Sequence, residues 1–89
     1  MSDTDLLVMI KSNLALTTDT WDEYLYNLID VSRQAIAREG ITLTDTMEDS
    51  NLIVMYASYL YRKRASDTAG MPRMLRMALN NRLFSEKSK

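Results

Sequence analysis

The residues of this sequence that could do chemistry are mostly basic, and they gather in its last third. They are Arg62, Lys63, Arg64, Arg73, Arg76 and Arg82. Because guanidinium groups bind phosphate and carboxylate oxygens, the pattern predicts an anion-facing surface for nucleic acid or for a protein partner. Arginine outnumbers lysine five to one over residues 61–84, which favours a protein partner, since arginine makes bidentate pairs and is enriched at interfaces. An ordinary solvated helix face would explain the same pattern.

Two tyrosines extend this candidate interface. Tyr26 and Tyr61 fall off the main apolar stripes of their segments, and exposed tyrosine is typical of protein interfaces. Met71, Met74 and Met77 recur every three residues. Because methionine commonly fills gaps in cores, we expect these three side chains to point inward.

The other polar residues do not predict an enzyme. The chain has no histidine and no cysteine, which removes imidazole acid–base chemistry, thiolate nucleophiles and the usual zinc ligands. Its paired carboxylates, Asp22 with Glu23 and Glu48 with Asp49, fall where helices are expected to begin, and acidic residues are favoured there by the helix dipole. The sequence therefore predicts no catalytic site, no metal site and no cofactor.

Four helical segments must position these residues. Apolar side chains recur at three- and four-residue spacing over about residues 4–14, 21–39, 48–64 and 72–84. The links are short, so the two long middle helices should pack antiparallel. We predict an all-α fold, a small four-helix bundle with two long antiparallel central helices. One helical domain should span residues 1–84, followed by a solvated tail over residues 85–89.

Local signals set the expected helix ends. Thr20 and Glu23 have the spacing of a capping box, and Thr46 with Asp49 repeats the pattern more weakly. Gly40 stands where a left-handed C-terminal cap is needed. Residues 41–44 predict a connector, and residues 65–70 predict a loop.

The predicted core follows from the apolar stripes. It comprises Trp21, Leu25, Leu28, Ile36, Leu52, Tyr56, Leu60, Leu75 and Leu79. The segment over residues 48–64 is apolar on nearly every side, because Val54, Ala57 and Tyr61 lie away from its main stripe. A helix of this kind is either central or meets another subunit on its second face.

The formal net charge of −1 hides a strong asymmetry. Residues 1–60 hold three basic and ten acidic residues, a balance of −7, whereas residues 61–89 hold eight basic and two acidic residues, a balance of +6. The two parts either neutralise each other within one molecule or attract charged partners. No run approaches 18 apolar residues, and the acidic N-terminus is unlike a signal peptide, so we expect no membrane association and a cytoplasmic site of synthesis.

Three stretches, taken in order, resemble the small phage head–tail connector proteins, the gene-product-six-like portal adaptors of tailed phages and prophages. The first is residues 22–29 (DEYLYNLI), continued by Ala35-Ile36 and Gly40. The second is residues 49–64, especially the run YASYLYRKR at 56–64. The third joins MPRML at 71–75 to LNNRL at 79–83. The order and spacing of the three carry the resemblance, which covers about residues 20–84.

The resemblance implies a non-enzymatic, all-helical structural protein of the virion. Proteins of that family form a homo-oligomeric ring of roughly a dozen subunits, a closed heterologous assembly. The ring docks on the portal protein and joins the DNA-filled head to the tail or to a tail-side stopper or tail-completion protein. DNA passes through the channel without sequence-specific contact. The implied location is the head–tail interface, after assembly in the bacterial host cytoplasm.

A second function class stays open at this point. The basic C-terminal part could serve a small helical nucleic-acid-binding or regulatory protein. The net charge of −1 favours the connector, because DNA-binding domains are usually strongly basic.

Overall fold

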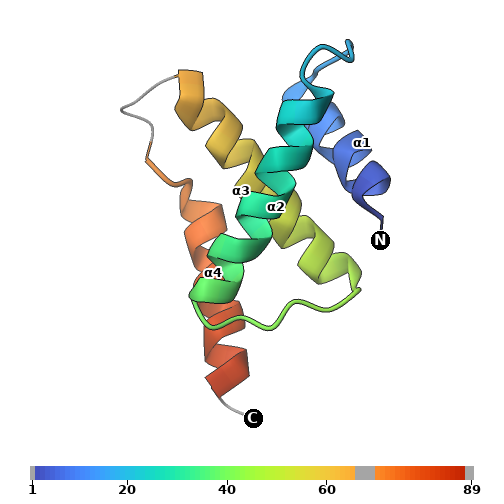
Figure 1. The fold of residues 1–89 in the computed structure, drawn as a ribbon. Helices are drawn as coiled ribbons and strands as arrows, with labels where there is room; N and C mark the ends of the chain where they lie inside the picture. Colours follow the sequence, from blue (N-terminus) through green and yellow to red (C-terminus); the bar gives the residue numbers. More distant parts are fainter. Residues whose placement is uncertain (1, 66–69, 88–89) are drawn as a thin grey trace.

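The computed structural model describes residues 2–65 and 70–87, and they form four helices: α1 (Asp3–Leu14), α2 (Asp22–Arg38), α3 (Met47–Ala65) and α4 (Arg73–Lys87). Figure 1 shows α2 crossing α3 in the opposite sense, with α1 at one side of the pair and α4 at the other. The described part of the chain contains no strand. The all-α four-helix prediction is therefore confirmed.

The ends of α1 and α2 follow local chemistry. The Ser2 hydroxyl caps α1 by accepting a hydrogen bond from the Asp5 amide at 3.2 Å. The expected capping box at Thr20 is wrong, because α2 begins one residue later, with Trp21 at the N-cap and no side-chain cap bond. Gly40 adopts a φ of +100° after the end of α2, as predicted, since glycine reaches this region without a Cβ clash.

The central helix of the molecule is α3, which packs against α1, α2 and α4. Val54 and Ala57, on its second apolar side, are both buried within the chain. Tyr61 is half-buried. Of the two explanations for a helix apolar on nearly every side, a central position therefore suffices, and α3 needs no second subunit to cover it.

Six of the nine predicted core residues are buried: Leu25, Leu28, Ile36, Leu52, Leu75 and Leu79. Trp21, Tyr56 and Leu60 are half-buried and pack against this core from its edge. For Trp21 and Tyr56 such a position is expected, because their polar ring atoms favour a partner or water. Leu6, Leu7 and Ile10 of α1 complete one side of the core.

The last helix is longer than predicted. The expected tail over residues 85–89 begins too early, because α4 continues through Lys87. Glu86 lies one turn after Arg82 and forms an ion pair with it at 3.1 Å, which holds the last turn in helical geometry. The predicted loop falls largely on residues 66–69, which lie outside the described residues, as do residues 88–89.

Two of the three methionines expected inside are outside. Met71 is half-buried, but Met74 is 74% exposed and Met77 is 55% exposed. The reason is that α4 packs mainly on one helix, α3, and that Leu75 and Leu79 already fill the side of α4 that faces it. Met74 and Met77 lie outside that contact and are left largely in solvent.

Candidate interaction surface

The basic residues predicted as one surface divide between two ends of the α3–α4 pair. The anchored end comprises Thr42, Thr44, Asp49, Arg82 and Glu86, around the first turn of α3 and the last turns of α4. The open end comprises Arg62, Lys63, Arg64 and Arg73, at the end of α3 and the start of α4.

At the anchored end, Asp49 is fully buried. Its carboxylate accepts hydrogen bonds from the backbone amide and hydroxyl of Thr44, at 2.5 and 3.0 Å. Both terminal nitrogens of the Arg82 guanidinium also donate to it, Nη2 at 3.2 Å. The Asp49 amide in turn donates to the Thr46 hydroxyl at 3.2 Å, so this predicted cap is confirmed. A buried carboxylate is stable only with such partners.

The side chain of Arg82 completes this network. Its Nη2 also donates to the carbonyl oxygen of Thr42 at 2.8 Å, and its Nε donates to Glu86 at 3.1 Å. The side chain is 13% exposed. Arg82 therefore differs from the solvent-facing interface residue that we expected: it fastens α4 to the α2–α3 connector and to α3, because Asp49 offers it a buried counter-charge.

The network shifts the acid–base behaviour of its members. Burial by itself would raise the pKa of the Asp49 carboxyl. The hydrogen bonds from Arg82 and Thr44 outweigh this effect and lower that pKa below its usual value. The hydrogen bond to Asp49 likewise raises the pKa of Arg82. Both groups thus stay charged at neutral pH.

Arg76 is also used within the chain. Its Nη1 lies 3.0 Å from Oε1 of Glu39, just after the end of α2. For Arg76 and Arg82, therefore, the acidic first part and the basic last part neutralise each other inside one molecule. This is one of the two alternatives that the charge asymmetry left open.

At the open end, Arg64 stacks on aromatic rings. Its guanidinium carbon lies 4.6 Å from the ring centroid of Trp21 and 5.1 Å from that of Tyr24. Tyr61 packs edge-on against Trp21, with centroids 6.4 Å apart. Tyr61, expected at an interface, thus lies in an aromatic cluster beneath Arg64, because the start of α2 brings Trp21 and Tyr24 to the end of α3.

The remaining interface candidates have different surroundings. Lys63 lies over the ring of Tyr59, with Nζ 5.8 Å from the centroid. Tyr26 is half-buried against the core. Arg62 and Arg73 are exposed, and within residues 2–65 and 70–87 neither of them forms an ion pair. They are the two candidate residues whose guanidinium groups are available to a partner.

Exposed acidic residues lie on α1 and α2. Asp5 and Glu23 are exposed and make no ion pair to any described residue. Asp3, by contrast, accepts a hydrogen bond from Arg33 at 2.5 Å, which lowers the pKa of its carboxyl. Unpaired acidic charge therefore lies on the first two helices and unpaired basic charge at the open end.

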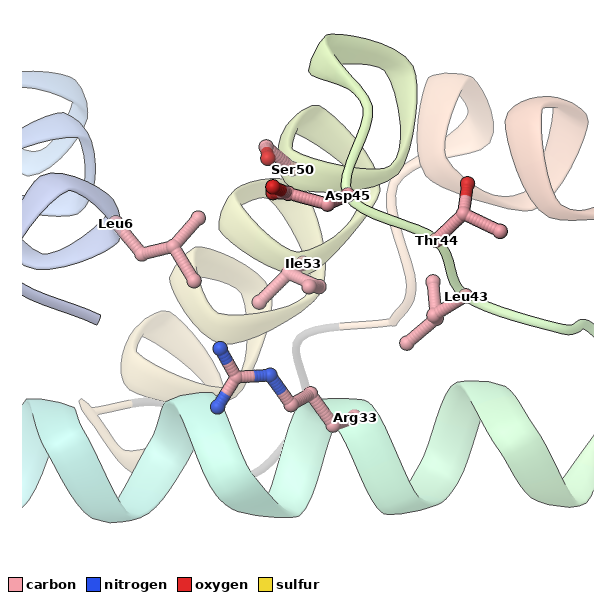
Figure 2. A pocket seen from close by; sticks show the side chains of 7 residues that line it. All are labelled: Leu6, Arg33, Leu43, Thr44, Asp45, Ser50 and Ile53. Carbon is pink, nitrogen blue, oxygen red and sulfur yellow. The ribbon is translucent and has the colours of Figure 1, made fainter. Parts of the chain in front are cut away.

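A cavity of about 400 Å³ lies among α1, α2, the connector and α3. Its lining residues are Leu6, Arg33, Leu43, Thr44, Asp45, Ser50 and Ile53. Figure 2 shows the Arg33 side chain reaching from α2 toward Leu6 and Ile53. Its guanidinium is already paired with Asp3 and, at 3.4 Å, with Asp30. At this cavity, Arg33 therefore links α2 to α1 through its ion pair with Asp3.

Among the residues that the structure describes, no group of three or more acidic side chains could hold a metal ion. None of the described helices combines the length and apolar character that crossing a bilayer requires.

No protein-family model matches this chain, and comparisons with curated proteins and with solved structures find no significant match. The resemblance to head–tail connectors accordingly rests on the order and spacing of the three sequence stretches, and its functional content is a proposal.

Proposed function

We propose that this protein is a structural subunit of a phage or prophage head–tail connector ring. It would dock on the portal protein and link the DNA-filled head to the tail or to a tail-side stopper protein. The three stretches between residues 22 and 83 support this assignment through the resemblance they carry. The structure adds a physical observation that is independent of the resemblance.

The observation that carries the proposal is the placement of unpaired charge. Asp5 on α1 and Glu23 on α2 are exposed acidic residues, whereas Arg62 and Arg73 are exposed basic residues at the open end. A closed ring of identical subunits needs two different, complementary surfaces that meet head to tail. Two exposed surfaces of opposite charge on one small molecule meet that requirement, and the charge would also fix the register of the contact.

The experiment is a charge-swap pair. One variant carries Arg62→Glu and Arg73→Glu, and the other carries Asp5→Lys and Glu23→Lys. Each variant alone should assemble poorly, because both of its surfaces then carry the same sign. An equimolar mixture should recover assembly, because each subunit again meets an opposite charge on both sides. Sedimentation velocity and electron microscopy would follow assembly, with and without a portal protein from the same genome as a template.

Two results would contradict this function. One is a gene with no portal, capsid or tail genes around it. The other is a basic-surface variant that assembles normally but binds duplex DNA more weakly, with a shallower dependence of affinity on salt. The second result would favour the nucleic-acid-binding alternative. The pairing of Arg76 and Arg82 within the chain already reduces the charge available to phosphate.

A further inference from the structure

A groove runs along the boundary between α3 and α4 and is lined by both helices. One hollow of about 270 Å³ lies among Glu48, Asn51, Leu52, Met55, Ala78 and Asn81. A second hollow, of about 230 Å³, is lined by Met55, Ser58, Arg62, Pro72, Met74 and Leu75, with Asn13 of α1 at its side. Met55 lines both hollows, so they are neighbours along the α3–α4 boundary, and we call the two together the α3–α4 groove.

The spacing of the lining residues matches a helix-sized site. On α3 the groove follows positions 48, 51, 55, 58 and 62, which form one stripe at three- and four-residue intervals. At 1.5 Å per residue this stripe is about 20 Å long, the length of roughly four helical turns. On α4, Met74, Ala78 and Asn81 form the facing stripe with the same intervals.

The floor and rim of the groove suit an apolar ligand face. Met74 is 74% exposed and Met55 is half-buried. Methionine side chains are flexible and polarisable, and they line grooves that accept amphipathic helices. Asn13 donates a hydrogen bond to Ser58 at 2.9 Å, which satisfies these polar groups at one side of the floor.

The two ends of the groove carry opposite charge, and this decides the orientation of an occupant. Arg62 lies at one end, exposed and without an ion-pair partner in the described chain. Glu48 lies at the other end with a side chain that is 75% exposed. Its nearest cation, Arg82, is 3.8 Å away and donates its hydrogen bonds to Asp49, Glu86 and Thr42 instead.

We propose that the α3–α4 groove is a docking site for an amphipathic helix of a partner protein, lying parallel to α3. Its N-terminal end, with a basic residue, would lie at Glu48, and its C-terminal end, with an acidic residue, would lie at Arg62. This orientation pairs the side-chain charges at both ends of the groove with opposite charges on the occupant. Apolar side chains on one face would cover Met55 and Met74. The inference does not rest on the connector function, since it uses only the groove and its charges.

The test uses a displayed library of amphipathic helices of about 15 residues, the length of the groove. All members carry apolar residues on one face, and the flanking terminal positions vary among Lys, Glu and Gln. Selection on the full chain should enrich Lys at the N-terminal end and Glu at the C-terminal end. The best peptide should bind at least about tenfold more tightly than its charge-reversed counterpart, as expected when paired charges become mispaired.

Variants then locate the site. Met74→Gln should weaken the selected peptide by about tenfold or more, because an apolar contact in the groove is lost. Met77→Gln is the matched control: Met77 is also exposed on α4 but does not line the groove, so binding should change little. Arg62→Glu should reverse the preference between the two charge arrangements. Circular dichroism would establish that each variant is folded, as expected for exposed positions.

Three outcomes would overturn the proposal. They are the absence of any enriched helix, equal effects of Met74→Gln and Met77→Gln, and equal affinity for the two charge arrangements. A fourth is that Met74→Gln abolishes self-association of the chain while no peptide competes with it. That result would assign the groove to a contact between copies of this protein. A failed charge-swap assembly experiment would leave the peptide results unchanged, so the two proposals are tested separately.

Discussion

The two ends of the α3–α4 pair use the same type of residue for different purposes. Arg82 lies at the anchored end with a fully buried carboxylate, a backbone carbonyl and a second carboxylate around it. Arg62 lies at the open end in solvent, and Arg64 rests on aromatic rings. The difference comes from the residues that the fold brings near each guanidinium. A basic segment can therefore be partly structural and partly available for binding.

The largest expected effect comes from breaking the anchored end. Arg82→Met keeps the aliphatic stem but leaves Asp49 charged, buried and without its cation, which should cost about 3–5 kcal/mol of unfolding free energy. Urea denaturation of the two proteins would measure it. Adding Asp49→Asn to Arg82→Met should recover part of the loss, because the unpaired charge is then gone. A loss below about 0.5 kcal/mol, the level of an ordinary surface substitution, would contradict the structural role given to Arg82.

The second prediction concerns how the stability of the unchanged protein depends on pH. The pKa of Asp49 is lowered in the folded protein, so the folded state binds a proton less readily than the unfolded state does. Its stabilising effect is therefore complete above the unfolded pKa of about 3.9 and is lost as the pH falls below that value. We expect the urea midpoint to fall on acidification below about pH 4. The effect should be smaller than that of Arg82→Met, because a protonated Asp49 is neutral and needs no counter-charge.

A control separates Asp49 from the other acidic groups. Asp3 also has a lowered pKa, because Arg33 donates to it, and it contributes to the same acid-side loss. Asp49→Asn should flatten the pH dependence in part, and Asp3→Asn should remove a further part. An unchanged pH dependence in Asp49→Asn would show that the anchored end does not govern acid stability.

A smaller effect is expected from the aromatic cluster of the open end. Arg64→Gln removes the cation above Trp21 and Tyr24, and cation–π contacts at exposed sites contribute about 0.5–1 kcal/mol. The emission of Trp21, the only tryptophan in the chain, would report both the unfolding transition and the change in ring environment. Arg64→Lys should retain part of the effect. An unfolding free energy and emission spectrum identical to wild type in Arg64→Gln would argue against the stacking.

The smallest effect on stability should come from the exposed arginines. Arg62→Gln and Arg73→Gln, singly and together, should change the unfolding free energy by less than about 0.5 kcal/mol per substitution. The same variants should weaken assembly in the sedimentation experiment described above. A large loss of stability would mean that these residues belong with the anchored end, and the contrast between the two ends would not hold.

The helices could be predicted because their causes are local. The apolar spacing of Leu25, Leu28 and Ile36 indicates a buried face. The φ of +100° at Gly40 likewise follows from its place after the last turn of α2. The N-cap expected at Thr20 was wrong for an equally local reason, because Trp21 takes the N-cap position of α2 instead. A difference of one residue is within the usual imprecision of helix ends.

It was harder to predict which of the candidate basic residues are paired within the chain, because that depends on residues distant in the sequence. Arg82 and Asp49 are 33 positions apart, and only their packing together shows that one neutralises the other. Spacing alone could not distinguish Arg82 from Arg73, which share the same helix. The exposure of Met74 had the same origin, since it required knowing that α4 has one main neighbour. A signal was present in the position of Asp49 three residues after Thr46, in the first turn of α3, where the Asp49 amide donates to the Thr46 hydroxyl.

By itself, the sequence determined the four helices, the small apolar core and the presence of a −7 part and a +6 part in one chain. Periodicity, caps and composition act over a few residues and can be read directly. The tertiary structure decided which charged side chains form ion pairs within the molecule and which remain exposed for a partner. The reason is physical: a charge interacts strongly only with groups within a few ångströms, and residues far apart in the chain become neighbours only when the helices pack.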